Sequence, residues 1–333
     1  MTDWLVYRNE AHPHDGIDRL PAPPNWRTFS GGPALPTPPA EPDETQRRLG
    51  AMTGGEPNTT AVQMVNAALY LRRPLLVTGK PGVGKSALAF KVAHELGLGP
   101  VLVWPISSRS TLREALYEYD PIGRLRDENL RRAGAAADTD IGRYLTLGPL
   151  GTALLPYARP RVLLIDEIDK SDVDLPNDLL TVFEDGQYPI PELRRLAGEH
   201  PRVDVQTADG GTAPIREGRV TCQAFPFIVL TSNDEREFPP AFLRRCIRLT
   251  INEPDAAEVT AMITAQLGPE IAAAAQDMIE AFVTGRDETG TYATDQLLSA
   301  IYLRYSQADA AADEAMLRTV HHVLADLNHP GPA

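Results

Sequence analysis

The stretch GKPGVGKS, Gly79 to Ser86, fits the pattern G-x-x-x-x-G-K-[ST]. It follows the apolar run PLLVT and precedes SALAFKVAHELG, in which Leu88, Val92 and Leu96 fall on one helical face. A strand, a glycine-rich turn and a helix in this order form the context in which the pattern binds phosphate. The stretch therefore predicts an anion-binding loop set in an alternation of strands and helices.

The residue types in this loop suit a nucleoside triphosphate. Glycines let the backbone curl so that successive N–H groups point inward, and the following helix adds its N-terminal dipole. Lys85 is expected to contact the β- and γ-phosphates, and the Ser86 hydroxyl to ligate Mg²⁺. The residues expected to hold ATP are Gly79, Lys80, Pro81, Gly82, Val83, Gly84, Lys85, Ser86 and Ala87.

Two acidic residues end another apolar run. RVLLIDEIDK places Asp166 and Glu167 at the end of a predicted buried strand. Ligands of open α/β sheets bind beyond the carboxyl ends of the strands, so both carboxylates are expected at the phosphate site. We expect Asp166 to hold Mg²⁺ together with Ser86, and Glu167 to orient and deprotonate the water that attacks the γ-phosphate.

The stretch TSNDEREFPPAFLRRCIRL, Thr231 to Leu249, adds three candidates. Asn233 follows the apolar run FIVLTS, which puts it at the same sheet edge, where its amide would position the attacking water. Arg244 and Arg245 precede the last predicted strand, too far to reach the γ-phosphate of their own chain. We expect Arg245, with Arg244 as the second candidate, to act on the nucleotide of an adjacent subunit.

The chain divides into three parts. Residues 1–45 are rich in proline and form either a disordered leader or an arm anchored by Trp4, Tyr7 and Trp26, which favour the arm. Residues 46–252 carry the continuous apolar strands of a parallel sheet covered on both faces. Insertions interrupt them at about 110–160 and 187–222, the second with a predicted hairpin around Gly210-Gly211. Residues 253–333 are predicted to form a domain of four amphipathic helices.

The composition limits the functions open to the chain. A net charge of −13 over 333 residues disfavours sequence-independent nucleic-acid binding. Cys222 and Cys246 lack metal-ligand spacing and are expected to be buried thiols. His12 and His14 are expected to be surface residues, because no further metal ligands accompany them. The sequence shows neither a signal peptide nor an apolar run long enough to span a membrane, so we expect a cytoplasmic protein.

With these segments in order, the chain resembles the MoxR family of AAA+ ATPases over about residues 50–330. GKPGVGKS is similar to the Walker A motif, VLLIDEID to Walker B, and TSNDEREFPPAFLRRC to sensor 1 followed by the arginine finger. The resemblance implies a P-loop αβα sandwich with strand order 5-1-4-3-2, a helical lid, and a homo-oligomeric ring, commonly a hexamer. It also implies chaperone-like remodelling of a protein partner, often one with a von Willebrand A domain.

One departure from the family concerns the arginine called sensor 2. The corresponding stretch is YATDQLLSAI, with Gln296 at the expected position, and Arg304 and Arg318 are the possible substitutes. This departure motivates a second hypothesis for the function, a nucleotide-gated assembly switch or scaffold that hydrolyses ATP slowly. A nucleic-acid motor and a small-molecule kinase fit less well. Adenine contacts are expected around Asn58 to Val62 and in the lid.

Overall fold

The five apolar runs form the central sheet. The structure is a computed structural model that describes residues 4–39, 47, 49, 58–132, 140–289 and 294–305. The strands lie in the order β11 (Ile247–Thr250), β1 (Leu75–Thr78), β10 (Phe227–Ser232), β5 (Val162–Asp166) and β2 (Leu102–Pro105), and all neighbours are parallel. This is the order 5-1-4-3-2, so the predicted fold class is confirmed.

Helices cover both faces of this sheet, because alternate strand residues point to opposite sides. Leu75 and Val77 of β1 pack with helices α2 (Thr59–Leu71) and α3 (Ala87–Glu95). Leu76 belongs to the other cluster, with α6 (Pro149–Ala153) and α7 (Leu175–Asp185). Strands buried on both faces need continuous apolar runs, which is the pattern that the sequence carries.

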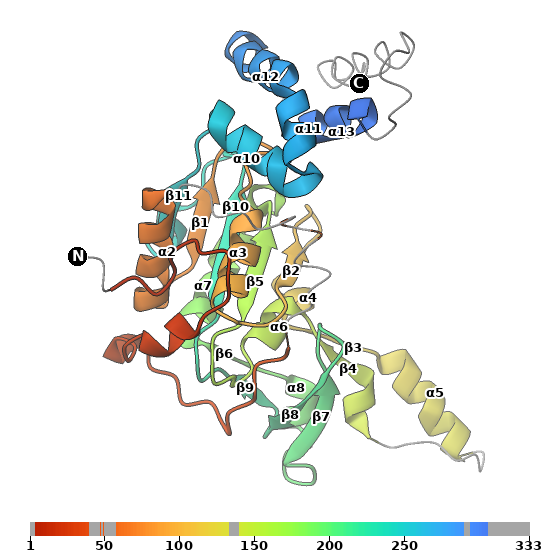
Figure 1. Ribbon diagram of the computed structural model, residues 1–333. Coiled ribbons are helices and arrows are strands. Elements are labelled where there is room, and N and C mark those ends of the chain that lie inside the picture. The colour runs from red at the N-terminus through yellow and green to blue at the C-terminus, as the bar shows by residue number, and fades with distance from the viewer. Residues whose placement is uncertain are drawn as a thin grey trace.

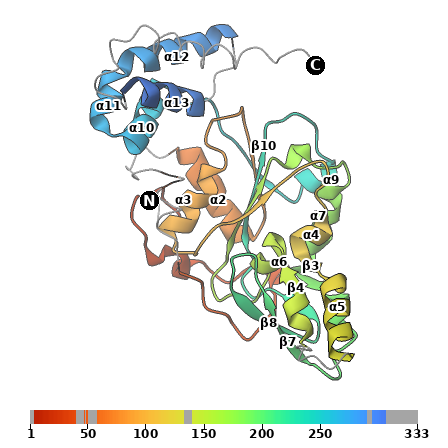
Figure 2. The ribbon, with the colours of Figure 1, turned by 90° about the vertical axis from the view of Figure 1, so that its right-hand side faces the viewer.

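The two insertions combine into a second sheet. Its order is β3 (Tyr117–Tyr119), β4 (Leu145–Leu147), β7 (Arg202–Gln206), β8 (Thr212–Arg216), β9 (Arg219–Thr221) and β6 (Gln187–Pro189). The hairpin expected around Gly210-Gly211 is the antiparallel pair β7–β8. Beside these strands lie α4 (Leu112–Leu116), α5 (Pro121–Arg132), η3 (Ile141–Tyr144) and α8 (Pro191–Arg194). Figures 1 and 2 show this sheet at the opposite end of the molecule from the C-terminal helices.

The N-terminal segment, over residues 4–39, lies against the core as an arm (Figure 1). It includes the short helices η1 (Asp15–Arg19) and η2 (Asn25–Arg27). Asn66 of α2 is fully buried and accepts the N–H groups of Val6 at 2.7 Å and Tyr7 at 3.1 Å. The Asn66 amide in turn donates to the Tyr7 carbonyl at 2.7 Å. Residues 4–39 therefore lie along the core as an arm. Of the three expected anchors Tyr7 is buried, whereas Trp4 is about half exposed and Trp26, at 76% exposed, does not anchor the arm.

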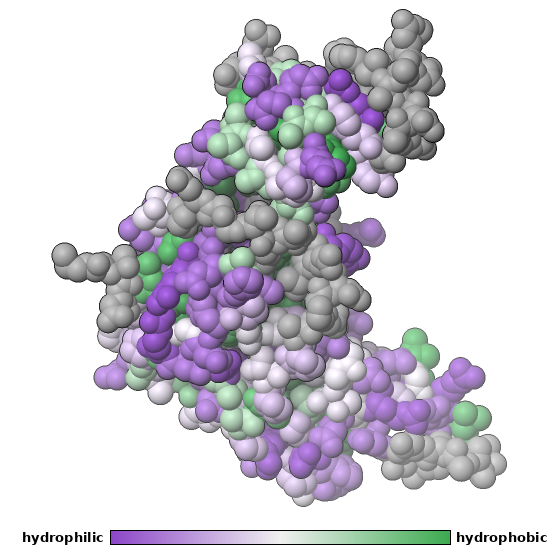
Figure 3. Space-filling view, viewed as in Figure 1, coloured by the Kyte–Doolittle hydropathy of each residue, from purple (hydrophilic) through white to green (hydrophobic). Residues whose placement is uncertain are grey.

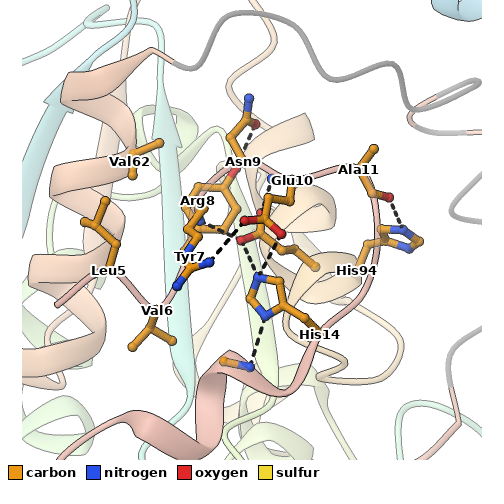
Figure 4. Close-up of polar contacts among 12 residues, drawn as sticks. Leu5, Val6, Tyr7, Arg8, Asn9, Glu10, Ala11, His14, Val62 and His94 are labelled. Carbon is orange, nitrogen blue, oxygen red and sulfur yellow. Dashed lines mark hydrogen bonds and ion pairs between the residues drawn. The ribbon is translucent and has the colours of Figure 1, made fainter. Parts of the chain in front are cut away.

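A second buried polar residue, Glu95 at the end of α3, fixes the next part of the arm, of which Figure 4 labels Arg8, Glu10 and His14. Its carboxylate accepts the N–H groups of Arg8 at 2.6 Å and Glu10 at 2.7 Å, and lies 3.0 Å from His14 Nε2. The expectation that His14 is a surface residue is therefore wrong. Its ring is half-buried, and it also accepts the Gly16 N–H to cap η1.

The C-terminal helices form the third part. The described helices are α10 (Ala256–Leu267), α11 (Pro269–Ala274), α12 (Gln276–Thr289) and α13 (Thr294–Tyr305), around a small apolar cluster that includes Val259, Ile263 and Leu297. They follow β11 and so stand beyond the carboxyl edge of the parallel sheet (Figure 1). The run EIAAAAQDMIEAFV, expected as one helix, is broken at Ala275 into α11 and α12. The predicted last helix lies outside the described residues.

Both cysteines are buried free thiols, as expected, and burial raises the pKa of each to about 12. No group of three or more His, Cys, Asp or Glu with the geometry of a metal site occurs within residues 4–39, 47, 49, 58–132, 140–289 and 294–305. Over the same residues, no helix has the length and apolar character needed to cross a membrane.

Candidate active site

The phosphate loop, residues 79–86, connects β1 to α3. Gly79, Gly82 and Gly84 have φ of +148°, +77° and +87°, which only glycine adopts without strain. A Cβ atom on Gly79 would lie 2.4 Å from the Ile251 carbonyl oxygen, so any larger side chain at this position would clash with the backbone. The backbone N–H groups of residues 82–85 have no acceptor in the part of the chain that the structure describes. The loop thus presents unpaired donors suited to phosphate oxygens.

Lys85 is the buried cation of this loop. Its Nζ donates to the carbonyl oxygens of Gly79 at 2.7 Å and Lys80 at 2.8 Å, and to Asn233 Oδ1 at 2.7 Å. Burial lowers its pKa, and nearby carboxylates, Asp169 foremost, oppose that shift. Since the ammonium group has three protons, a phosphate can bind it only by displacing one of these acceptors.

Ser86 and Asp166, the expected metal ligands, are brought together. Ser86 Oγ donates to Asp166 Oδ1 at 2.7 Å, and Thr231 Oγ1 donates to the same oxygen at 2.6 Å. Asp166 Oδ2 has no partner among the described residues. A hydroxyl and a carboxylate with one available oxygen are hard oxygen donors of the kind that Mg²⁺ prefers, so the residues fit this ion.

Glu167 follows Asp166 in a left-handed conformation, with φ of +61° and ψ of +50°. This conformation is uncommon for a residue other than glycine and tends to occur at functional sites. Thr231 Oγ1 accepts the Glu167 N–H at 2.9 Å and so helps to hold the turn. The Glu167 carboxylate is paired with Lys170 Nζ at 2.7 Å, and this contact raises the pKa of Lys170.

Asn233 lies at the end of β10, at the edge shared with Lys85 and Asp166, as the sequence predicted. What the sequence analysis missed is Asp169, which holds it. Asp169 is 5% exposed, and its Oδ2 accepts the Asn233 N–H at 2.8 Å and the Glu235 N–H at 3.4 Å. Its Oδ1 is buried without a partner among the described residues. The signal available was its place in DEID, three residues after Asp166.

Thr231 is the second residue that the sequence analysis missed. It is 1% exposed and links Asp166 to the Glu167 backbone through one hydroxyl. Threonine is common in strands, so only the sheet register distinguishes this position from an ordinary strand residue. β10 lies between β1 and β5, and this order brings its last residues between the phosphate loop and the acidic pair.

Arg244 and Arg245 lie between α9 (Pro240–Leu243) and β11. Arg245 Nε donates to Glu184 Oε1 of α7 at 2.7 Å, and Nη1 donates to the Ala241 carbonyl oxygen at 3.2 Å. The Arg244 side chain is exposed. The described contacts of Arg245 are thus with α7 and its own turn, not with the phosphate loop of the same chain.

The side chains of the remaining candidates fall outside this cluster. Lys80 is exposed and pairs with Glu253 at 3.0 Å, at the start of the C-terminal part. Asn58 accepts the Ala61 N–H at 3.1 Å and caps α2. Gln296 lies half-buried on α13, and Arg304 donates to Asp277 at 3.2 Å within the C-terminal helices. Arg318 lies outside the described residues, so the sensor 2 substitute stays unassigned.

Comparison with known proteins places the chain in a family. Residues 74–246, more than half of the chain, match the model of the AAA domain of the dynein-related subfamily, so the chain belongs to this family. Among solved structures the chain is similar to NtrX from Brucella abortus in complex with ATP, with 14% identity and a TM-score of 0.36. That similarity covers 86% of this chain and 71% of NtrX. No curated protein matches the chain.

Proposed function

We propose that this protein binds and hydrolyses ATP as an oligomer and uses the cycle to remodel a protein partner. The observation that carries the ATPase proposal is the convergence of three strand ends on one site. Lys85 and Ser86 follow β1, Asp166 ends β5, and Asn233 follows β10. Membership of the AAA domain family supports the same activity.

In this proposal each residue acts on the triphosphate or the attacking water. The loop N–H groups and the Lys85 ammonium bind the phosphate oxygens and stabilise the charge that develops on them. Mg²⁺, when held by Ser86 and Asp166, supplies electrostatic stabilisation to the phosphate oxygens. Glu167 accepts a proton from the attacking water, and Asn233 orients that water.

The oligomeric part of the proposal concerns Arg245. An arginine that acts on a neighbouring nucleotide must project away from its own phosphate loop, and Arg245 contacts α7 instead. Its guanidinium would stabilise transition-state charge in the adjacent subunit, a contribution of about 10³–10⁵ in rate in other phosphoryl-transfer systems. The resemblance to MoxR proteins supports a hexameric ring and a partner with a von Willebrand A domain.

A second candidate function, a slow assembly switch, is favoured because two of the proposed catalytic residues form ion pairs with residues that have no proposed role in hydrolysis. Glu167 is bound by Lys170, and Arg245 by Glu184, each at 2.7 Å. Each ion pair engages a side chain that hydrolysis requires, the Glu167 carboxylate or the Arg245 guanidinium, in a contact unrelated to hydrolysis. If the two ion pairs persist after the subunits assemble, hydrolysis is slow and the protein acts as a nucleotide-gated assembly switch.

Mixing two inactive variants tests the leading proposal. Glu167→Gln keeps Arg245 but lacks the base, and Arg245→Ala keeps the base but lacks the arginine. We expect each variant alone to bind ATP without turnover, and the mixture to regain activity because intact sites form at mixed interfaces. Lys85→Ala, which should lose ATP binding, is the control.

The mixture could lack ATPase activity although the wild type is active and light scattering shows that the two variants assemble together. That result would reject Arg245 as the arginine that acts between subunits. Wild-type protein that binds ATP, assembles and turns over slowly in every condition would favour the switch instead. Multiple turnover by Glu167→Gln would reject Glu167 as the base.

A further inference from the structure

Helix α5 presents an outer face with no covering element. Ile122, Leu125 and Leu130 are 79%, 63% and 45% exposed, and Figure 3 shows separate apolar groups among hydrophilic residues where α5 projects from the molecule. Arg126 lies on the same face, one turn after Ile122, and has no hydrogen-bond or ion-pair partner among the described residues. The face is therefore apolar with an unpaired positive charge.

The opposite face of α5 fixes how the helix is held. Asp127 accepts the Tyr144 hydroxyl at 2.7 Å, and Arg124 donates to the Tyr119 hydroxyl at 3.1 Å. These contacts attach α5 to η3 and β3 of the second sheet. Because that side is occupied, the face that carries Ile122 and Leu125 points away from the rest of the chain.

A groove of complementary character lies between α4, α7 and β6. Its volume is about 570 Å³, enough for a few side chains. Leu116, Val182 and Tyr188, each at most 9% exposed, supply its apolar lining. Asp178 and Asp185, one heptad apart on α7, are exposed carboxylates without partners among the described residues. Arg219 also lines the groove but is engaged with Gln187 at 3.1 Å.

We propose that α5 of one copy of this chain docks into the groove between α4 and α7 of a second copy. The apolar residues of α5 would meet the apolar lining, and Arg126 would meet the carboxylates of Asp178 and Asp185. Figure 1 shows α5 projecting away from α7 of its own chain, which suits a contact between chains. Burying apolar area while pairing opposite charges gives both affinity and a defined orientation.

A second copy is favoured over a different partner because this chain carries both complementary surfaces, the apolar face of α5 with Arg126 and the groove with its two carboxylates. The chain carries a net charge of −13, so two copies repel on average, and a contact between them gains from pairing the local positive face of α5 with an acidic rim. Helix and groove are different surfaces, so the contact is heterologous and propagates from copy to copy, as a ring requires. The inference rests on the proposed oligomeric ATPase and specifies how its subunits meet.

Charge reversal in the full-length chain tests the contact. With a non-hydrolysable ATP analogue present, we expect Arg126→Glu and Asp185→Arg each to weaken self-association about tenfold in sedimentation experiments. The double variant restores the pair with inverted charges and should recover association. Arg195→Glu, at an exposed arginine that does not line the groove, is the matched control and should associate like the wild type.

Cross-linking provides a second measurement that does not depend on the stability of the charge variants. Oxidation of a mixture of Ile122→Cys and Thr181→Cys chains should give a disulfide-linked dimer that neither chain forms alone. Absence of that dimer would overturn the proposal, and so would Arg126→Glu and Arg195→Glu having equal effects on association. A wild type that stays monomeric, or a double variant no better than the singles, would also overturn it.

The cross-linking and ATPase measurements distinguish a failure of this contact from a failure of the proposed ATPase function. Arg245→Ala should lose turnover and keep the Ile122–Thr181 cross-link, because Arg245 does not line the groove. If the Ile122→Cys and Thr181→Cys chains form the cross-link while the wild type does not hydrolyse ATP, the proposed ATPase fails and the contact stands. If the wild type hydrolyses ATP and the mixed variants of Glu167 and Arg245 regain activity without the cross-link, the contact fails and the ATPase stands.

Discussion

Lys85 Nζ lies 2.7 Å from Asn233 Oδ1, so the phosphate-loop lysine and the strand-end asparagine are directly bonded. The two residues are 148 positions apart in the chain, and the pairing of β1 with β10 brings them together. The Asn233 N–H in turn donates to the Asp169 carboxylate. When a phosphate oxygen accepts a hydrogen bond from the Lys85 ammonium, the bond from Lys85 to Asn233 is among the three that can break. Where the phosphate displaces Asn233, occupancy of the phosphate site is coupled to the loop after β10.

The first prediction concerns Asp169 as a positioning residue. Asp169→Ala leaves the half-buried Asn233 N–H without its acceptor, so the asparagine loses its fixed orientation. We expect turnover to fall about ten- to hundredfold while ATP affinity stays within a few-fold, because an interaction needed in the transition state is lost. Steady-state kinetics and nucleotide titration measure the two effects separately.

Asp169→Asn is the conservative control, since its amide oxygen can still accept the Asn233 N–H. It should recover part of the lost turnover. Equal losses of kcat and of ATP affinity in Asp169→Ala would instead indicate a general loss of folding at the site. No recovery in Asp169→Asn would show that the negative charge, and not the hydrogen bond, is what matters.

The pH dependence of ATP binding should report on Lys85. Burial lowers the pKa of this lysine from 10.5, so the ammonium loses its proton at lower pH than an exposed lysine does. Because the charged form binds phosphate, ATP affinity should weaken as pH rises through that lowered pKa. The affinity present at neutral pH is thus lost on the alkaline side and not on the acid side.

Lys85→Arg is the matched variant, because arginine keeps its charge throughout this range. Its ATP affinity, whatever its value at neutral pH, should stay flat over the range in which the wild type weakens. Titration of a fluorescent ATP analogue at a series of alkaline pH values measures both profiles. Parallel decline of the two proteins would exclude Lys85 as the titrating group.

The central fold was predictable because each of its strands is a continuous apolar run, and burial on both faces demands that pattern. Of the second sheet only the β7–β8 hairpin was predictable, since the other strands are short and come from two insertions. β4 and β7 meet through one residue pair, Thr146 with Gln206, and no local pattern encodes such a pairing. The site shows the same division. Asp166 ends a strand, and Lys85 and Asn233 follow strands, so the apolar runs locate them. Asp169 matters only because tertiary packing buries it against the Asn233 backbone.

The pairing of Glu167 with Lys170 leads to a third prediction. Removal of the cation in Lys170→Met frees the carboxylate to accept a proton from water. Both side chains are more than 40% exposed, so the pair is worth at most about 1 kcal/mol, and we expect up to about a fivefold faster single turnover. Rapid-quench measurement with saturating ATP gives this rate. An unchanged or slower rate would show that Lys170 does not restrain Glu167.

The fourth prediction concerns the attachment of the N-terminal arm to α3. Glu95 is completely buried, and its carboxylate accepts the backbone N–H groups of Arg8 and Glu10. Glu95→Ala leaves both donors without an acceptor and removes the partner of His14. Since a hydrogen bond to a charged group contributes about 1.5–3 kcal/mol and these two bonds are only partly buried, we expect a loss of about 2–4 kcal/mol in the free energy of unfolding.

Urea unfolding measures that loss, and hydrogen exchange at residues 6–10 locates it. Glu10→Ala is the matched control, because the Glu10 carboxylate is about half exposed and makes only surface ion pairs with Arg8 and His14. It should change the stability by less than about 1 kcal/mol. If Glu95→Ala unfolded like Glu10→Ala, with exchange at residues 6–10 unchanged, the arm would be held by the apolar contacts of Val6, Tyr7 and Ile17 and by Asn66, and the buried carboxylate would contribute nothing to its attachment.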